Sequence, residues 1–141
     1  MKHVFTFLVL LMFWAAPYAV KAYSGTIRNS SGSLINTVDK DGTVRNSSGS
    51  RIGQFHSDGT VRNASGSYAG KVYDDGTIRN SSGSYVGRLE KDGTVRGRDG
   101  GYLGKIEDGG TVRNSSGSRL GEAKDVDKKI VVTVFFTEFY K

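Results

Sequence analysis

One nine-residue phrase, Gly-Thr-Val-Arg-Asn-Ser-Ser-Gly-Ser, recurs along this chain, with substitutions, at a constant interval of 17 residues. Its six copies begin at Gly25, Gly42, Gly59, Gly76, Gly93 and Gly110. A constant period of this size is typical of repeat architectures, in which one unit cannot bury a core alone and its neighbours supply the missing surface. The repeat therefore constrains the fold more than any single motif does.

Each unit contains two short segments with the composition of β-strands. In the second unit these are Thr43 to Arg45 and residues 51–55. The Asn-Ser-Ser-Gly between them and the Asp-Gly that follows are typical of tight turns, because Asn, Asp and Gly favour or tolerate turn backbones. No unit shows a helical period, so the sequence predicts an all-β fold of five to six β-hairpins, each 17 residues long.

Three apolar positions recur in every unit and predict a shared core, because three modest side chains cannot stabilise one isolated hairpin in water. The first set is Ile27, Val44, Val61, Ile78, Val95 and Val112. The second is Ile35, Ile52, Ala69, Val86, Leu103 and Leu120, and the third is Val38, Phe55, Val72, Leu89, Ile106 and Ala123.

The last two sets are three residues apart, which breaks the alternation of a regular strand. Gly53 lies in the gap of the second unit, and the first unit has Asn36 there. We expect a β-bulge, or a close approach of neighbouring backbones, at this repeat position.

Two arrangements of the hairpins are open on this evidence: a closed ring, which removes exposed strand edges, or a short β-hairpin solenoid with protected ends. The segment at residues 130–136 is apolar on both alternating faces, as in strands buried on both sides. We expect it to be a C-terminal strand that closes or fills the ring and belongs to its core.

The two ends of the chain differ from the repeats. Residues 1–22 combine a basic start, a short apolar run and the small residues of a cleavage site, which predicts a signal peptide and export to the periplasm, the cell surface or the medium. Residues 23–123 then form the hairpin domain, and residues 124–141 its connector and closing strand. The chain has no cysteine, and no transmembrane segment is expected after cleavage.

Residues suited to catalysis or metal binding are few. His56 is the one histidine outside the predicted signal peptide. Acidic residues precede the turn glycines, but hairpin turns account for them better than calcium sites do. The Asn-Ser-Ser tripeptides match a glycosylation pattern, and again a turn is the simpler interpretation. We therefore expect no enzyme activity, no metal and no cofactor.

Arginine and tyrosine provide a candidate binding surface, because both are common anchors of such surfaces. Arg28, Arg45, Arg62, Arg79, Arg96 and Arg113 share one repeat position. Tyr68, Tyr85 and Tyr102 share another, which Arg51 and Arg119 occupy in other units. Tyrosine faces stack on sugars, and arginine pairs with anionic groups. The alternative is that these arginines only pair with acidic residues of the turns.

The repeated Asp-Gly-Thr-Val-Arg-Asn-Ser-Ser-Gly-Ser, with the following Ile-Gly and an apolar aromatic C-terminal segment behind a signal peptide, resembles the five-fold β-flower proteins, small exported proteins known from gut Bacteroidales. The resemblance covers nearly all of residues 23–141. It implies five β-hairpins around a pseudo-fivefold axis and implies no activity. Gly97, Arg98 and Asp99 depart from the usual Asn-Ser-Ser of the turn.

These observations predict an exported, non-enzymatic structural or binding protein. Its expected ligand is a glycan of the cell envelope or another anionic polymer, bound at the repeated arginines and tyrosines. An alternative is an envelope assembly or protein-interaction module that acts through the apolar C-terminal strand. Nucleic acid is not expected as a partner, because the chain is exported and its positive charge is spread evenly.

Overall fold

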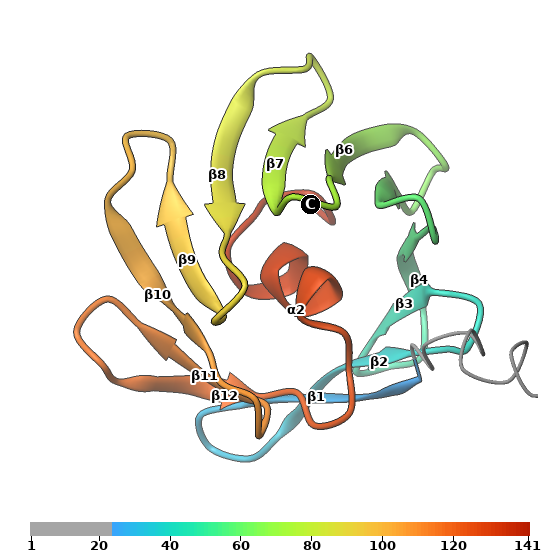
Figure 1. The fold of residues 1–141 in the computed structure, drawn as a ribbon. Helices are drawn as coiled ribbons and strands as arrows, with labels where there is room; N and C mark the ends of the chain where they lie inside the picture. Colours follow the sequence, from blue (N-terminus) through green and yellow to red (C-terminus); the bar gives the residue numbers. More distant parts are fainter. Residues whose placement is uncertain (1–23) are drawn as a thin grey trace, which may run out of the picture.

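The computed structural model describes residues 24–141, and the expected signal peptide lies outside the described residues. The described part is a closed ring of twelve antiparallel strands around one helix (Figure 1). The strands are β1 (Gly25–Asn29), β2 (Leu34–Val38), β3 (Thr43–Asn46), β4 (Arg51–Phe55), β5 (Thr60–Asn63), β6 (Tyr68–Val72), β7 (Thr77–Asn80), β8 (Tyr85–Leu89), β9 (Thr94–Gly97), β10 (Tyr102–Ile106), β11 (Thr111–Asn114) and β12 (Arg119–Glu122). The helix is α2 (Lys128–Phe135).

Each strand pairs with its neighbours in the chain, and β1 pairs with β12 to close the ring. The all-β fold and the closed ring are therefore confirmed, and the open solenoid is wrong. Within residues 24–141 the ring holds six hairpins, one for each copy of the repeat, so their arrangement is sixfold and not the fivefold one that the resemblance implied.

The expected bulge is present in all six hairpins. In the second hairpin Val44 lies opposite Gly53 and Arg45 lies opposite Arg51, so Ile52 is the additional residue of the bulged strand. The close approach is also present, because a Cβ atom on Gly53 would lie 2.4 Å from the carbonyl oxygen of Arg62. The bulge turns Ile52 partly out of the core while Phe55 remains buried.

The three apolar sets differ in burial. The first and third sets form the inner surface of the ring, and each of their members is buried. The second set lies at the bulge and packs only partly against this core, and Leu103 is 41% exposed. Two side chains per repeat therefore supply most of the core that the ring provides.

The expected C-terminal strand is wrong in its secondary structure, although the segment is part of the core. Residues 128–135 form α2, which lies in the centre of the ring (Figure 1). Ile130, Val131, Val132 and Thr133 are all 0% exposed. All twelve strands of the ring already have a neighbour on each side. A further strand in the centre would leave its backbone N–H and C=O groups without partners, whereas a helix satisfies them internally.

Local signals support the helix as well. Asp127 is its N-cap and accepts a hydrogen bond from the backbone N–H of Lys129 at 2.9 Å. The hydroxyl of Thr133 donates to the carbonyl oxygen of Ile130 at 2.6 Å, so this buried polar group is also paired. Within residues 24–141, no helix is long and apolar enough to span a membrane.

The turns between hairpins are closed by Asp and Gly. Gly42 has a φ of +88°, and a Cβ atom there would lie 1.9 Å from the carbonyl oxygen of Phe55, so no other residue fits. Asp41 accepts a hydrogen bond from the backbone N–H of Thr43 at 3.0 Å. This bond favours the ionised carboxylate and lowers its pKa below the usual 3.8. The pKa values of Asp58, Asp75 and Asp92 are lowered by the equivalent hydrogen bond from the backbone N–H of the threonine two residues later.

We predict that removing the C-terminal segment unfolds the protein. Deleting residues 130–141 removes the filling of the ring, and Ile130→Ala alone should cost about 2–5 kcal/mol of unfolding free energy. Thermal melting followed by circular dichroism measures both effects. A chain that ends at Lys129 and keeps its melting temperature and β-sheet signal would contradict the prediction.

The turn carboxylates predict a loss of stability in acid. A carboxyl group whose pKa is lower in the folded state stabilises the fold above the unfolded pKa, and this contribution disappears as the pH falls through the folded pKa. The melting temperature should therefore fall below about pH 3.8. Replacing the four aspartates at 41, 58, 75 and 92 with asparagine keeps the acceptor oxygen but removes the titration. This variant should show a smaller fall, and an unchanged pH profile would refute the assignment.

Candidate binding surface and pocket

The six arginines of the repeat position brace the turns of their own hairpins. In each, Nη1 donates a hydrogen bond to a glycine carbonyl four residues further along the chain, at 3.0–3.2 Å. The acceptors are Gly32, Gly49, Gly66, Gly83, Gly100 and Gly117. The arginine position therefore has a structural role in every hairpin.

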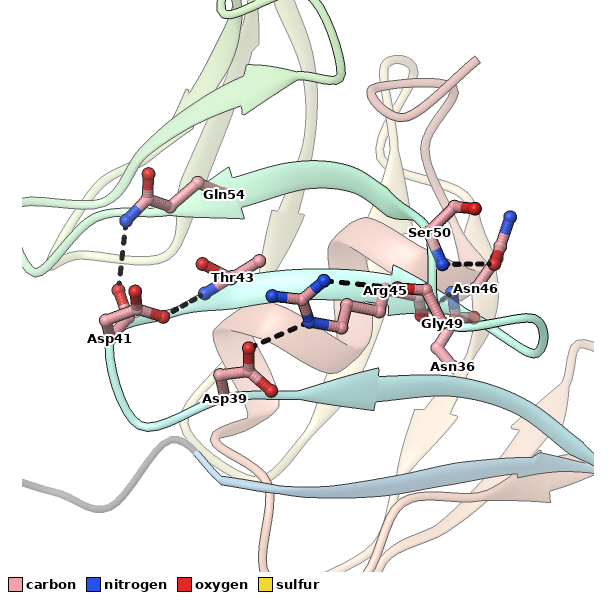
Figure 2. A network of polar contacts seen from close by, with 9 residues as sticks. All are labelled: Asn36, Asp39, Asp41, Thr43, Arg45, Asn46, Gly49, Ser50 and Gln54. Atoms are coloured by element: carbon pink, nitrogen blue, oxygen red, sulfur yellow. Dashed lines mark hydrogen bonds and ion pairs between the residues drawn. The ribbon is translucent and has the colours of Figure 1, made fainter.

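Three of these arginines also bind an acidic residue in the turn that precedes their strand. Figure 2 shows Arg45 between Asp39 and Gly49, with its Nε atom 2.9 Å from Asp39. Arg96 and Glu90 form the same pair, as do Arg113 and Glu107. These ion pairs are about two-fifths exposed, so solvent screens them and their contribution to stability is small.

The tyrosines lie directly opposite arginines across the hairpin. The pairs are Arg62 with Tyr68, Arg79 with Tyr85, and Arg96 with Tyr102. Residues opposite each other in antiparallel strands project from the same face of the sheet. Tyr68 and Tyr102 are 39% and 43% exposed, and Tyr85 is half-buried. Three consecutive hairpins thus present the same Arg–Tyr pair, and we call these six residues the Arg–Tyr arc.

The arc is limited to these three hairpins because other residues replace tyrosine elsewhere. Arg51 donates to the carbonyl oxygen of Ala64 in the next hairpin, and Arg119 donates to that of Ser30 across the closure of the ring. In the first hairpin Leu34 lies opposite Arg28. The structure therefore separates the nine predicted site residues into six that form the arc and three, Arg28, Arg45 and Arg113, that brace turns outside it.

The Asn-Ser-Ser segments act as turns. In the second hairpin the side-chain oxygen of Asn46 accepts a hydrogen bond from the backbone N–H of Ser48 at 3.1 Å. It accepts another from the backbone N–H of Ser50 at 3.0 Å (Figure 2). Four other hairpins repeat this pattern. The amide oxygen of the repeat therefore serves the backbone of the turn, and the hydroxyl of the second serine donates to the same oxygen.

A pocket of about 480 Å³ opens between strands β5 to β10 and the chain after α2. It brings together Tyr68 and Arg96 from two different pairs of the arc. Sequence reasoning did not identify the other residues that define it, above all Gly87, Phe136 and Phe139. The repeat predicts a glycine at position 87, but no pattern in the sequence indicates which of these glycines the C-terminal aromatic residues cover.

His56 occupies the place that Asp39, Glu90 and Glu107 hold in other hairpins. Its Nε2 atom is buried and has no hydrogen-bond partner. No group of three or more histidine, aspartate or glutamate side chains in residues 24–141 is placed to hold a metal ion.

Comparison with known proteins supplies the family. The family model described as "5-fold beta-flower protein" matches residues 57–141, which is more than half of the chain. The chain belongs to the 5-fold beta-flower family. No curated protein and no solved structure matches it. The matched residues contain the last four hairpins and α2, so the central helix belongs to the part of this beta-flower chain that the family model describes.

We predict that the bracing arginines stabilise this beta-flower fold. Arg79→Met should lower the unfolding free energy by about 0.5–1.5 kcal/mol, because it removes the hydrogen bond to Gly83. Arg98→Met, at the exposed turn of the fifth hairpin, is the matched control and should have little effect. Chemical unfolding measures both variants. Equal stability of the two would mean that the bond to the turn contributes nothing.

Proposed function

We propose that this chain is an exported, non-enzymatic binding protein that recognises a glycan or another anionic polymer along the Arg–Tyr arc. The observation that carries the proposal is the presence of one Arg–Tyr pair at the same place in three consecutive hairpins. A polymer repeats its own chemical groups, so a surface that repeats its contacts suits it better than it suits a single small ligand.

The chemistry of the Arg62–Tyr68 and Arg79–Tyr85 pairs fits a sugar that carries an acidic group, whereas Arg96 of the third pair already binds Glu90. The exposed face of tyrosine can pack against the apolar face of a sugar ring. The guanidinium of Arg79 or Arg62 uses Nη1 for its turn, which fixes the position of the cationic group without neutralising its charge. A fixed cation loses less side-chain entropy when it binds an anion than a flexible one does.

Repetition compensates for weak individual contacts. A single exposed contact of this kind is too weak for useful affinity, but three contacts held on one rigid ring act together and raise the overall affinity. The twelve paired strands provide the rigidity. The arc is open to solvent, as a surface that binds a long chain has to be.

The alternative function, docking of a partner through an apolar C-terminal strand, has less support. The side chains that would dock, Ile130, Val131 and Val132, are buried in the centre of the ring. We therefore place the binding role on the outside of the ring. A hydrolase screen in which a point mutation abolishes specific turnover would overturn the non-enzymatic part of the proposal.

The test compares polymer binding by two sets of tyrosine variants. The protein from residue 23 onwards should be retarded in affinity electrophoresis by polygalacturonate, more strongly at low salt, and little by neutral dextran. The triple variant Tyr68→Ala, Tyr85→Ala and Tyr102→Ala should bind about tenfold more weakly or worse, since each aromatic contact is worth about 0.5–1.5 kcal/mol.

Tyr73→Ala is the matched control, because Tyr73 is 37% exposed but lies outside the arc. It should keep the binding of the unmodified protein. If neither polygalacturonate nor any acidic glycan of an array retards the protein at low salt, the proposed function is wrong.

A further inference from the structure

Four aromatic residues at the C-terminus lie on the bulge glycines of four of the hairpins. Added Cβ atoms would lie 2.9 Å from the ring of Phe135 at Gly121, 3.0 Å from that of Phe136 at Gly104, 2.5 Å from that of Phe139 at Gly70, and 2.6 Å from that of Tyr140 at Gly53. Each glycine therefore leaves room for one aromatic ring, and a side chain on the glycine position itself would take up that room. We call these places ring seats.

The aromatic residues and the hairpins they cover run in opposite orders along the chain. As the C-terminal segment advances from residue 135 to residue 140, the seats it covers move back through the sixth, fifth, third and second hairpins. The fourth hairpin is passed over. The residues that fall at this point, Thr137 and Glu138, carry no aromatic ring.

Gly87, the bulge glycine of the fourth hairpin, is consequently the glycine seat without a ring. The atoms nearest to an added Cβ are the carbonyl oxygen and carbon of Arg96 and the Cα of Gly97, all of which belong to the backbone. The first hairpin has no comparable seat, because Asn36 replaces the glycine and donates a hydrogen bond to the carbonyl oxygen of Arg45 at 3.1 Å.

The pocket of about 480 Å³ includes this vacant seat. Gly87 lines it, and Phe136 and Phe139, which cover the seats on either side, line it as well. Thr137 and Glu138, which lie between these two phenylalanines in the chain, also border the pocket. The pocket is therefore the space that a fifth aromatic ring would occupy.

Two departures from the repeat place small residues beside this space. Gly97 lies opposite Gly87, where the second, third and fifth hairpins place an asparagine opposite the bulge glycine. Ala69, which also lines the pocket, is the smallest residue at a position that otherwise holds Ile, Val or Leu. Both small residues lie beside the vacant seat, Gly97 opposite Gly87 and Ala69 in the neighbouring third hairpin.

We propose that the Gly87 seat is a binding site for the aromatic ring of a small molecule. The four equivalent seats elsewhere in the barrel each hold the phenyl or phenol ring of a side chain. A flat six-membered aromatic ring is therefore the shape that such a seat accepts. A ligand ring there would contact Phe136 and Phe139, and aromatic pairs of this kind add to the energy of burial. A pocket of about 480 Å³ is within the range of small-molecule sites. This site adjoins the polymer surface, because Tyr68 and Arg96 border both, but its bound ring would lie on Gly87 and not along the arc.

The experiment is an NMR titration of the protein from residue 23 onwards with phenol and with indole, and with cyclohexanol as a non-aromatic control of similar size to phenol. We expect saturable shifts of the backbone amides of Gly87 and Gly97 with both aromatic probes. Cyclohexanol should bind several-fold more weakly, because its puckered ring does not fit a seat for a flat one. Shifts that do not saturate, or equal affinity for cyclohexanol, would overturn the proposal.

Ala69→Leu tests the location of the site. Leucine is native at this position in other hairpins, so the fold should tolerate it, while the pocket becomes narrower. Phenol binding should weaken about tenfold, the usual penalty for a misfit of this size. Ile52→Leu, the same position in a hairpin that does not line the pocket, should leave binding unchanged. If Ala69→Leu melts at a much lower temperature, Ala69→Val is the smaller replacement for the same measurement.

The result separates the two proposals. Ala69→Leu should retain the binding of polygalacturonate. The double variant Tyr85→Ala and Tyr102→Ala, at two arc residues that do not line the pocket, should bind the polymer more weakly but retain the response of Gly87 to indole. Phenol binding that is the same in Ala69→Leu and in the unmodified protein would show that the ring seat is not the site, whatever the outcome with polymers.

Discussion

The structure depends on complete backbone pairing around the ring. Once β1 meets β12, every strand of the described chain has two partners, and the space inside can accept only a segment that needs no further backbone bonds. This condition excludes a strand and selects a helix, even for a sequence rich in β-branched residues. The condition also explains why the apolar residues at 130–132 are consecutive, since a helix surrounded by strands needs apolar side chains on more than one of its sides.

The bulge glycines are where the C-terminal segment after α2 packs against the strands of the ring. Each allows the neighbouring strand's carbonyl to approach closely, and each leaves a place where a ring can lie directly on the backbone. The hydroxyl of Tyr140 shows how the last of these rings is fixed, because it lies 3.0 Å from the Thr133 hydroxyl on α2. Burial raises the pKa of Tyr140 to about 12, against which the hydrogen bond to Thr133 acts only in part.

Much of this fold could be predicted from the sequence because six copies of the repeat show the same strand and turn pattern. The period, the turn residues and the buried positions of Val44 and Phe55 all follow from local patterns. The helix could not be predicted in the same way, because Val131 and Val132 favour strands locally and only the closed ring excludes one. The arginines were recognised as a repeated position, but their bonds to turn carbonyls depend on the fold. The ring seats depend on a register between the C-terminal segment and the hairpins that no local pattern contains.

The closure between β1 and β12 has a consequence for how many chains can form one ring. It joins Arg28 to Glu122 and Asn29 to Gly121, two residue pairs where the other junctions between hairpins have three. An open chain would expose both of these edges, and two open chains could pair with each other end to end, because all junctions share one antiparallel geometry. Such a double ring would need to enclose two helices in a much wider centre, and neither helix could contact all the hairpins around it. The helix therefore does more than fill the ring: it favours closure within one chain over exchange between two.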